Sequence, residues 1–162
     1  MIQLATQDAT ENLARAMRPH LRPGDTLLLN GQVGVGKSAF ARALIQDAMA
    51  VGGGAIEPVP SPTFTLVQVY DTPCGAYWHA DLYRLGSSGE LAELGLDEAF
   101  ETAITLVEWP ERLGAAKPAR YLDLTLYNGE GDDARTAALL PTGPRWDWID
   151  VMRQSFSTKS KS

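Results

Sequence analysis

One stretch of the chain combines three structural signals and limits the possible folds more than any other. Residues 26–30, "TLLLN", form a short apolar run typical of a buried strand. The next segment, "GQVGVG", carries three glycines, and from Lys37 the good helix formers Ala, Arg, Leu, Ile and Met continue to about Ala50. Glycines at 52–54 then end the run. The stretch therefore predicts a strand that enters a helix through a glycine-rich turn.

The glycine-rich turn matches a phosphate-binding pattern. Gly31, Gly36, Lys37 and Ser38 satisfy G-x-x-x-x-G-K-[ST], and Gly34 is an additional glycine. Glycine permits the dihedral angles and the close approach by which backbone N–H groups surround phosphate oxygens. The lysine would contact the β- and γ-phosphates, the serine would offer a hydroxyl to Mg²⁺, and the helix would add the positive end of its dipole. The pattern, together with its strand and helix, predicts a nucleoside triphosphate site.

A site of this class also needs a carboxylate near the metal, normally at the tip of a buried strand beside the strand that precedes the loop. The apolar run "ITLVE" ends at Glu108, and "HADLYRL" places Asp81 at the end of another strand. Asp25 precedes the loop's own strand and lies at its wrong end. Both Glu108 and Asp81 could also be carboxylates at surface turns, so the residues alone leave the choice of metal ligand open.

The rest of the pattern predicts the fold class. The predicted order is strand, helix, strand, helix, hairpin, helix, strand and hairpin, at residues 2–6, 9–21, 26–30, 37–50, 65–81, 87–100, 103–109 and 121–141. This order predicts a three-layer α/β, P-loop NTPase-like domain with a mixed parallel and antiparallel sheet. We expect the domain to occupy residues 1–150 and residues 151–162 to form a polar, flexible tail.

Composition narrows the setting. With one cysteine and two histidines the chain has no disulfide framework, and a zinc site is improbable. No apolar run approaches the ~20 residues of a membrane span, and the first residues lack the pattern of a signal peptide. We therefore expect a cytoplasmic protein without membrane contact. A net charge of −6 argues against binding of nucleic acid by this chain alone, so any RNA would be bound through a partner protein.

Five segments, in this order, carry a family resemblance: "GQVGVGKS", "SPTFTLV", "HADLYRL", "ELGLDEAF" and "LVEWPER". From about Thr6 to Leu140 the chain resembles the TsaE (YjeE) family of bacterial P-loop ATPases in tRNA threonylcarbamoyladenosine biosynthesis. The resemblance implies a domain that binds ATP and Mg²⁺ and hydrolyses ATP weakly alone. It also implies work with the TsaB–TsaD pair, which modifies the adenosine next to the anticodon in tRNAs reading codons that begin with A. The ATP cycle would regulate or reset that pair, and tRNA would be met only through the complex.

The resemblance also implies residue roles. The phosphates and adjoining nucleotide would contact the loop and the first helical turn, namely Gly31, Val33, Gly34, Val35, Gly36, Lys37, Ser38 and Ala39. Mg²⁺ would be held by Ser38 and Glu108. The implied catalytic residues are Lys37, a switch-like Thr63, Asp81 in the metal shell or beside the attacking water, and Glu108. Trp109 would lie near the nucleotide, although packing at the strand exit is its alternative. The adenine end would be met by Thr6 and, more weakly, by Arg135.

The chain departs from the family's usual G-[DE]-L-G-A-G-K-T loop. Gln32 replaces the acid, which makes a catalytic role for that side chain unexpected, whereas Ser38 keeps the metal hydroxyl. His79 is interpreted as a core or edge histidine, and Tyr83 and Arg84 as either partner contacts or a helix cap.

Other functional classes are less well supported. A kinase would show clustered arginines in a lid, and a GTPase would show N-K-x-D; the sequence has neither. A binding module in which ATP orders residues 55–65 is the remaining alternative.

Overall fold

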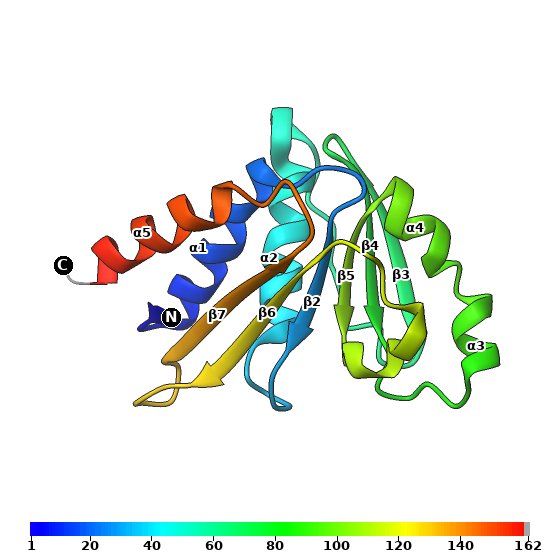
Figure 1. The fold of residues 1–162 in the computed structure, drawn as a ribbon. Helices are drawn as coiled ribbons and strands as arrows, with labels where there is room; N and C mark the ends of the chain where they lie inside the picture. The colour runs from blue at the N-terminus through cyan, green and yellow to red at the C-terminus, as the bar shows by residue number, and fades with distance from the viewer. Residues whose placement is uncertain (161–162) are drawn as a thin grey trace.

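A seven-stranded sheet forms the centre of the molecule (Figure 1). The computed structural model describes residues 1–160, with the side chains of Ser88 and 157–160 excepted. The strand order is β1-β7-β6-β2-β5-β4-β3. The strands are Ile2–Leu4 (β1), Thr26–Asn30 (β2), Val67–Thr72 (β3), Gly75–Asp81 (β4), Ile104–Glu108 (β5), Tyr121–Asn128 (β6) and Arg135–Thr142 (β7).

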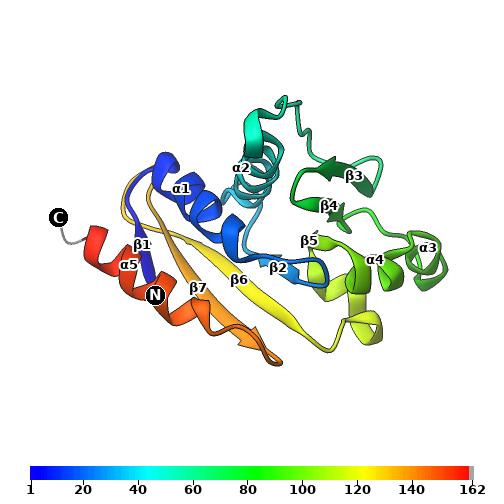
Figure 2. The same cartoon turned by 90° about the horizontal axis from the view of Figure 1, so that it is seen from above.

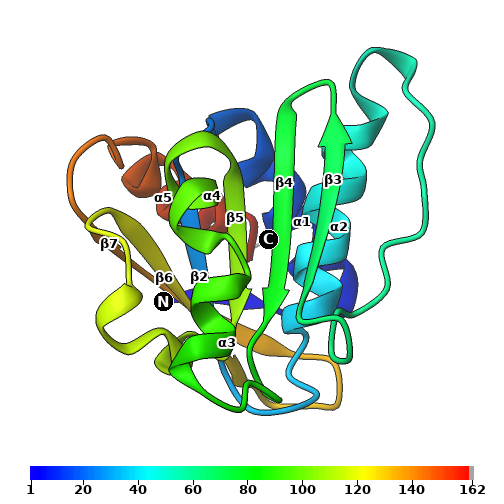
Figure 3. The ribbon, with the colours of Figure 1, turned by 90° about the vertical axis from the view of Figure 1, so that its right-hand side faces the viewer.

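Helices cover both faces of this sheet. The α-helices are Gln7–Met17 (α1), Lys37–Ala50 (α2), Ser88–Glu93 (α3), Leu96–Thr102 (α4) and Trp148–Ser160 (α5). Short 3-10 helices span Arg18–His20, Val51–Gly53 and Pro110–Ala116. Helices α1 and α2 lie on one side of the sheet, and α3 and α4 lie on the other (Figures 2 and 3). The predicted three-layer α/β architecture is therefore confirmed. Within residues 1–160, no helix has the length and apolar character needed to cross a membrane.

The middle of the sheet is parallel and its margins are antiparallel. Strand β2 pairs in parallel with β5 and β6, and β4 pairs in parallel with β5. Strands β1, β7 and β3 pair antiparallel with their neighbours. Every residue of β5 is buried, as expected for a strand covered on both faces. The mixed sheet is therefore the predicted one.

The parallel register brings three strand ends to one edge. Glu108 at the end of β5 pairs with Leu29 of β2 on one side and with Asp81 of β4 on the other. The glycine-rich loop starts directly after Asn30, the last residue of β2. Because ligands bind at the carboxyl ends of strands in open α/β sheets, the fold collects the loop and both candidate acids where a ligand site is expected.

The hydrophobic core consists of two clusters, one on each face of the sheet, because successive side chains of a strand point to opposite faces. On β2, Leu27 and Leu29 belong to the cluster that includes the buried faces of α1 and α2, whereas Leu28 belongs to a smaller cluster with Leu96 and Phe100 of α4. One short apolar run therefore supplies both layers.

One predicted helix is divided in two. Residues 87–100 were expected to be continuous, but α3 ends at Glu93 and α4 begins after Gly95, whose φ is 79°. Glycine adopts this left-handed conformation without steric cost, so it permits the break. Ser87 caps α3, because its side chain accepts a hydrogen bond from the Glu90 amide and the Glu90 carboxylate accepts one from the Ser87 amide.

The structure corrects the prediction of a polar flexible tail at residues 151–162. Helix α5 continues through this segment to Ser160, while residues 161–162 lie outside the described residues. Ile149, Met152 and Phe156 are buried and join the main core. Their spacing places them on one face of a helix, and that face packs near β1 and α1 (Figure 1).

Candidate nucleotide-binding site

The loop between β2 and α2 is built on glycines with positive φ. Gly31, Gly34 and Gly36 have φ of 142°, 83° and 113°. At Gly31 a Cβ would lie 2.7 Å from the carbonyl oxygen of Leu126, so a side chain there would collide with β6. Gly36 precedes the first residue of α2, where backbone N–H groups have no partner within the helix and are available to an anion.

A cavity of about 410 Å³ opens beside this loop. Ten of the residues predicted for the site line it: Val33, Gly34, Gly36, Lys37, Ser38, Ala39, Thr63, Asp81, Glu108 and Trp109. Ser61 and Tyr83 complete the lining. The cavity falls within the usual size range of small-ligand sites and collects residues from four separate parts of the chain.

Lys37 is buried, with 6% of its surface exposed. Its Nζ donates a hydrogen bond to the carbonyl oxygen of Gly31 at 2.7 Å and lies 4.3 Å from the centroid of the Trp109 ring. A buried ammonium needs such partners, because it has lost its hydration. The lysine is therefore held at the wall of the cavity by the loop on one side and an aromatic face on the other.

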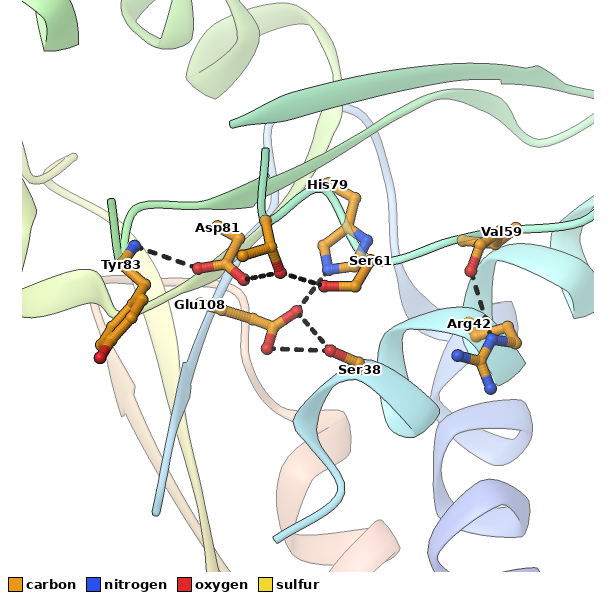
Figure 4. Close-up of polar contacts among 9 residues, drawn as sticks. Ser38, Arg42, Val59, Ser61, His79, Asp81, Tyr83 and Glu108 are labelled. Carbon is orange, nitrogen blue, oxygen red and sulfur yellow. Dashed lines mark hydrogen bonds and ion pairs between the residues drawn. The ribbon is translucent and has the colours of Figure 1, made fainter. Parts of the chain in front are cut away.

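Glu108 is also buried, with 3% of its surface exposed. The Ser38 hydroxyl lies 3.2 Å from Oε1 and 3.1 Å from Oε2 of this carboxylate. Nε2 of His79 lies 2.7 Å from Oε2 (Figure 4). The two residues predicted to bind the metal are thus in direct contact, although they are 70 positions apart in the sequence.

The donor set of Ser38 and Glu108 suits Mg²⁺. Both are oxygen donors at one wall of the cavity, and Mg²⁺ is usually bound through one or two carboxylates together with substrate phosphates and water. Among the described residues no group of three or more His, Cys, Asp and Glu side chains forms a metal cluster. The residues present therefore fit a magnesium ion that arrives with a nucleotide.

Asp81 has a different set of partners. Its Oδ2 accepts a hydrogen bond from the Thr63 hydroxyl at 3.3 Å, and its Oδ1 accepts one from the Tyr83 amide at 3.1 Å. The Thr63 and Ser61 hydroxyls are 2.9 Å apart. Asp81 therefore connects the end of β4 to the loop at residues 61–63, whereas Glu108 contacts the first turn of α2.

Trp109 follows Glu108 in a left-handed conformation, with φ of 58°. This conformation is uncommon for a residue other than glycine and turns the chain sharply into the helix at Pro110–Ala116. The indole lies between Lys37 and Tyr83, whose ring centroid is 5.0 Å away. This position is compatible with both interpretations of Trp109, contact with the nucleotide and packing at the strand exit, because the side chain lines the cavity and also packs on its neighbours.

Four of the predicted binding residues do not line this cavity. Gly31 and Val35 contribute backbone contacts instead, since their carbonyl oxygens accept hydrogen bonds from Lys37 and Arg135. Thr6 caps α1 by accepting the Ala9 amide at 3.0 Å. Arg135 lines a separate cavity of about 670 Å³ along residues 3–5, and its bond to Val35 braces the loop. The roles of Thr6 and Arg135 at the adenine end stay predictions.

His79 and Ser61 are site residues that the sequence reasoning did not select. His79 was interpreted as a core or edge histidine, and it is indeed buried, but its partner is Glu108. Strand periodicity contained the signal: His79 and Asp81 are two residues apart, so they lie on the same face of β4. Ser61 had no comparable signal, because it lies in a proline-rich loop.

This fold, with a glycine loop at the end of β2 and carboxylates at the ends of β5 and β4, defines a P-loop NTPase-like α/β domain. The sequence model described as threonylcarbamoyl adenosine biosynthesis protein TsaE matches residues 4–137. The chain therefore belongs to the TsaE family, which confirms the resemblance drawn from its motifs.

Individual relatives support the family assignment, and a solved structure shows the same fold. The chain is 40% identical over 123 residues to the tRNA threonylcarbamoyladenosine biosynthesis protein TsaE of Rickettsia bellii, covering 76% of this chain and 83% of the relative. The protein of the same name from Bacillus subtilis is 32% identical over 143 residues, covering 88% and 85%. A crystal structure of Bacillus subtilis YdiB has the same fold, with a TM-score of 0.72 at 23% identity and coverage of 99% and 98%.

Proposed function

We propose that the protein is a magnesium-dependent ATPase of tRNA threonylcarbamoyladenosine biosynthesis, acting in the cytoplasm on a TsaB–TsaD complex rather than on tRNA directly. The observation that carries the ATPase proposal is the contact between Ser38 and Glu108, at 3.1 and 3.2 Å, beside the glycine loop. The names of the relatives support the biosynthetic role. The protein would regulate or reset the complex and would not itself transfer the threonylcarbamoyl group.

The residues suggest a division of labour during hydrolysis. The loop amides and Lys37 would bind and orient the β- and γ-phosphates. Ser38 and Glu108 would hold Mg²⁺, which when bound neutralises charge that develops on the phosphates. Asp81, at the end of β4, faces the same cavity and would orient the attacking water or accept its proton. The Thr63 hydroxyl, which donates a hydrogen bond to Asp81, would help to orient that water.

Exposed apolar side chains near the cavity support dependence on a partner. Val33 and Phe64 are 79% and 83% exposed, and Tyr83 is 50% exposed. Val33 and Tyr83 line the cavity itself, and Phe64 follows the lining residue Thr63. Exposed apolar groups around a cavity are typical of surfaces that bind a ligand or another protein. A TsaB–TsaD complex seated here would exclude water and supply a group missing from the isolated chain.

A second candidate is a nucleotide-gated binding module with incidental hydrolysis. The loop at residues 55–65 is fastened to α2 through two backbone carbonyls, since Arg42 donates to Val59 at 3.2 Å and Gln46 donates to Glu57 at 3.1 Å. Its other end reaches Asp81 through Thr63. A phosphate bound in the cavity would order the loop at residues 55–65 and so change the surface that a partner protein meets.

Multiple-turnover ATP hydrolysis, measured with and without TsaB–TsaD, separates the candidates. The ATPase proposal predicts slow turnover alone, strong stimulation by the pair, and loss of both in Lys37→Ala. Tight binding to the pair without stimulation would favour the gated module. Unchanged ATPase activity in Lys37→Ala would contradict the phosphate-binding role of the loop.

A further inference from the structure

We propose that His79 is a positioning residue for Glu108, holding the carboxylate in the direction of Ser38. The inference deepens the proposed function and rests on it in one respect, namely that Glu108 is the carboxylate that meets the metal. The contact itself, between Nε2 of His79 and Oε2 of Glu108 at 2.7 Å, does not depend on that role.

The contact is the product of strand register. His79 pairs with Leu106, and Asp81 pairs with Glu108, so His79 lies diagonally behind Glu108 on the same face of the sheet. Only 1% of His79 and 3% of Glu108 is exposed. Water is therefore a poor competitor for this hydrogen bond.

The hydrogen bond has a defined direction. Because a carboxylate oxygen only accepts, the hydrogen bond is donated by the Nε2–H group of His79 to Oε2 of Glu108. The opposite ring nitrogen, Nδ1, is buried and has no hydrogen-bond partner in the described part of the chain. The only polar bond that the described structure gives the His79 ring is therefore the one to Glu108.

This asymmetry argues against a purely packing role. A buried polar atom without a partner is unfavourable, and an apolar side chain of similar size would fill the same space without it. Among the described contacts of the imidazole, only the hydrogen bond to Glu108 offsets the cost of burying Nδ1 without a partner. His79 thus acts on the carboxylate, whereas the metal and the nucleotide would be met by other residues.

The arrangement leaves the carboxylate little rotational freedom. Oε2 is anchored by His79 from β4, and both oxygens lie near the Ser38 hydroxyl at the start of α2. Removing a residue that orients a metal-binding side chain in this way commonly lowers the metal affinity by about 10–100-fold. The lone pairs of Glu108 are directed toward Ser38 before any ligand binds.

The first test compares His79→Gln with His79→Asn. The Gln amide nitrogen can reach the position of Nε2, whereas the Asn amide is too short and reaches only that of Nδ1. Affinity for an ATP analogue is measured with and without Mg²⁺. In the Asn variant we expect the gain that Mg²⁺ confers to fall about tenfold or more, with the Mg²⁺-free affinity at the parent value. The Gln variant should keep most of the gain. An equal loss in both variants, or an equal loss with and without Mg²⁺, would overturn the inference.

Tyr77→Phe is the matched control. Tyr77 lies two residues before His79 on the same face of β4, is fully buried, and has a hydroxyl without a hydrogen-bond partner among the described residues. Burial raises the pKa of this phenol, so it stays neutral throughout the assay range. Its removal changes a buried polar atom without touching Glu108, and the Mg²⁺ dependence should match that of the parent.

A second test needs neither nucleotide nor metal. Thermal unfolding of His79→Leu, Glu108→Leu and the double variant forms a cycle. We expect the drop in Tm caused by His79→Leu to be at least halved when Glu108 is already Leu. Additive drops in Tm would overturn the inference. Coupled drops in a protein that binds no ATP would instead contradict the proposed function and leave the His79–Glu108 relationship intact.

Discussion

The ammonium nitrogen of Lys37 lies 4.3 Å from the centroid of the Trp109 ring and donates a hydrogen bond to Gly31. The lysine belongs to the first turn of α2, and the tryptophan directly follows the last residue of β5. The lysine proposed to bind phosphate and the residue next to the candidate metal ligand are therefore in contact at the wall of the cavity.

Replacing Trp109 tests this support. A partly buried cation–π contact contributes about 0.5–2 kcal/mol, so Trp109→Leu should weaken ATP binding by about two- to thirtyfold. Trp109→Phe keeps an aromatic face and should lose less. Binding of an ATP analogue by calorimetry measures both. Trp148→Leu is the control, because Trp148 stacks on His20 and lines a different cavity. Parent-like affinity in Trp109→Leu would show that the contact does not prepare Lys37 for phosphate.

Asp81→Asn separates hydrolysis from binding. If Asp81 orients or deprotonates the attacking water, its loss should lower turnover by about 10²–10⁴-fold. ATP affinity should change little, since the Asp81 carboxylate bonds to Thr63 and Tyr83 rather than to the glycine loop. The measurement is single-turnover hydrolysis in the presence of TsaB–TsaD. Asp71→Asn, an exposed carboxylate on β3, is the control. Similar turnover in the Asp81 and Asp71 variants would assign Asp81 a structural role.

Helix α5 contributes to stability. Met152 is 4% exposed and belongs to the main core, so Met152→Ala should lower the free energy of unfolding by about 2–5 kcal/mol. The neighbouring Val151 is 63% exposed, and Val151→Ala should stay within about 0.5 kcal/mol of the parent. Denaturant titrations of the two variants give both values. Equal stability of the two variants would contradict the packing of Met152 in the core.

The parts of the fold with strong local signals were predictable. The β2–loop–α2 unit follows from an apolar run, three glycines and helix formers that are adjacent in sequence. The positions of the other strands along the chain follow from the alternation of apolar and polar residues and from the turn residues between them. Helix α5 was missed because its buried face consists of sparse apolar residues, Ile149, Met152 and Phe156, in a polar background. Their i, i+3, i+7 spacing is compatible with a helix, but the polar Ser- and Lys-rich composition favoured a flexible tail, and packing against distant β1 and α1 stabilises the helix.

The same distinction applies to the site. Glu108 could be named as a candidate because a buried strand ends in an acid, whereas the choice between Glu108 and Asp81 as metal ligand came only from the family resemblance. The bond from His79 to Glu108 depends on the register between β4 and β5, which joins residues 29 positions apart. Arg135 was expected at the adenine end of the nucleotide, a role that stays a prediction, and the structure shows that its guanidinium donates a hydrogen bond to the Val35 carbonyl.

The central claim is that Ser38 and Glu108 hold Mg²⁺ for a nucleotide bound in the glycine loop. The most direct test is the affinity for ATP, with and without Mg²⁺, of the parent and of Glu108→Gln, which removes the charge and keeps the size of the side chain. We expect Mg²⁺ to tighten ATP binding to the parent and to have little effect on ATP binding to the variant, while the Mg²⁺-free affinities of the two proteins agree. The same Mg²⁺-dependent gain in both proteins would contradict the central claim.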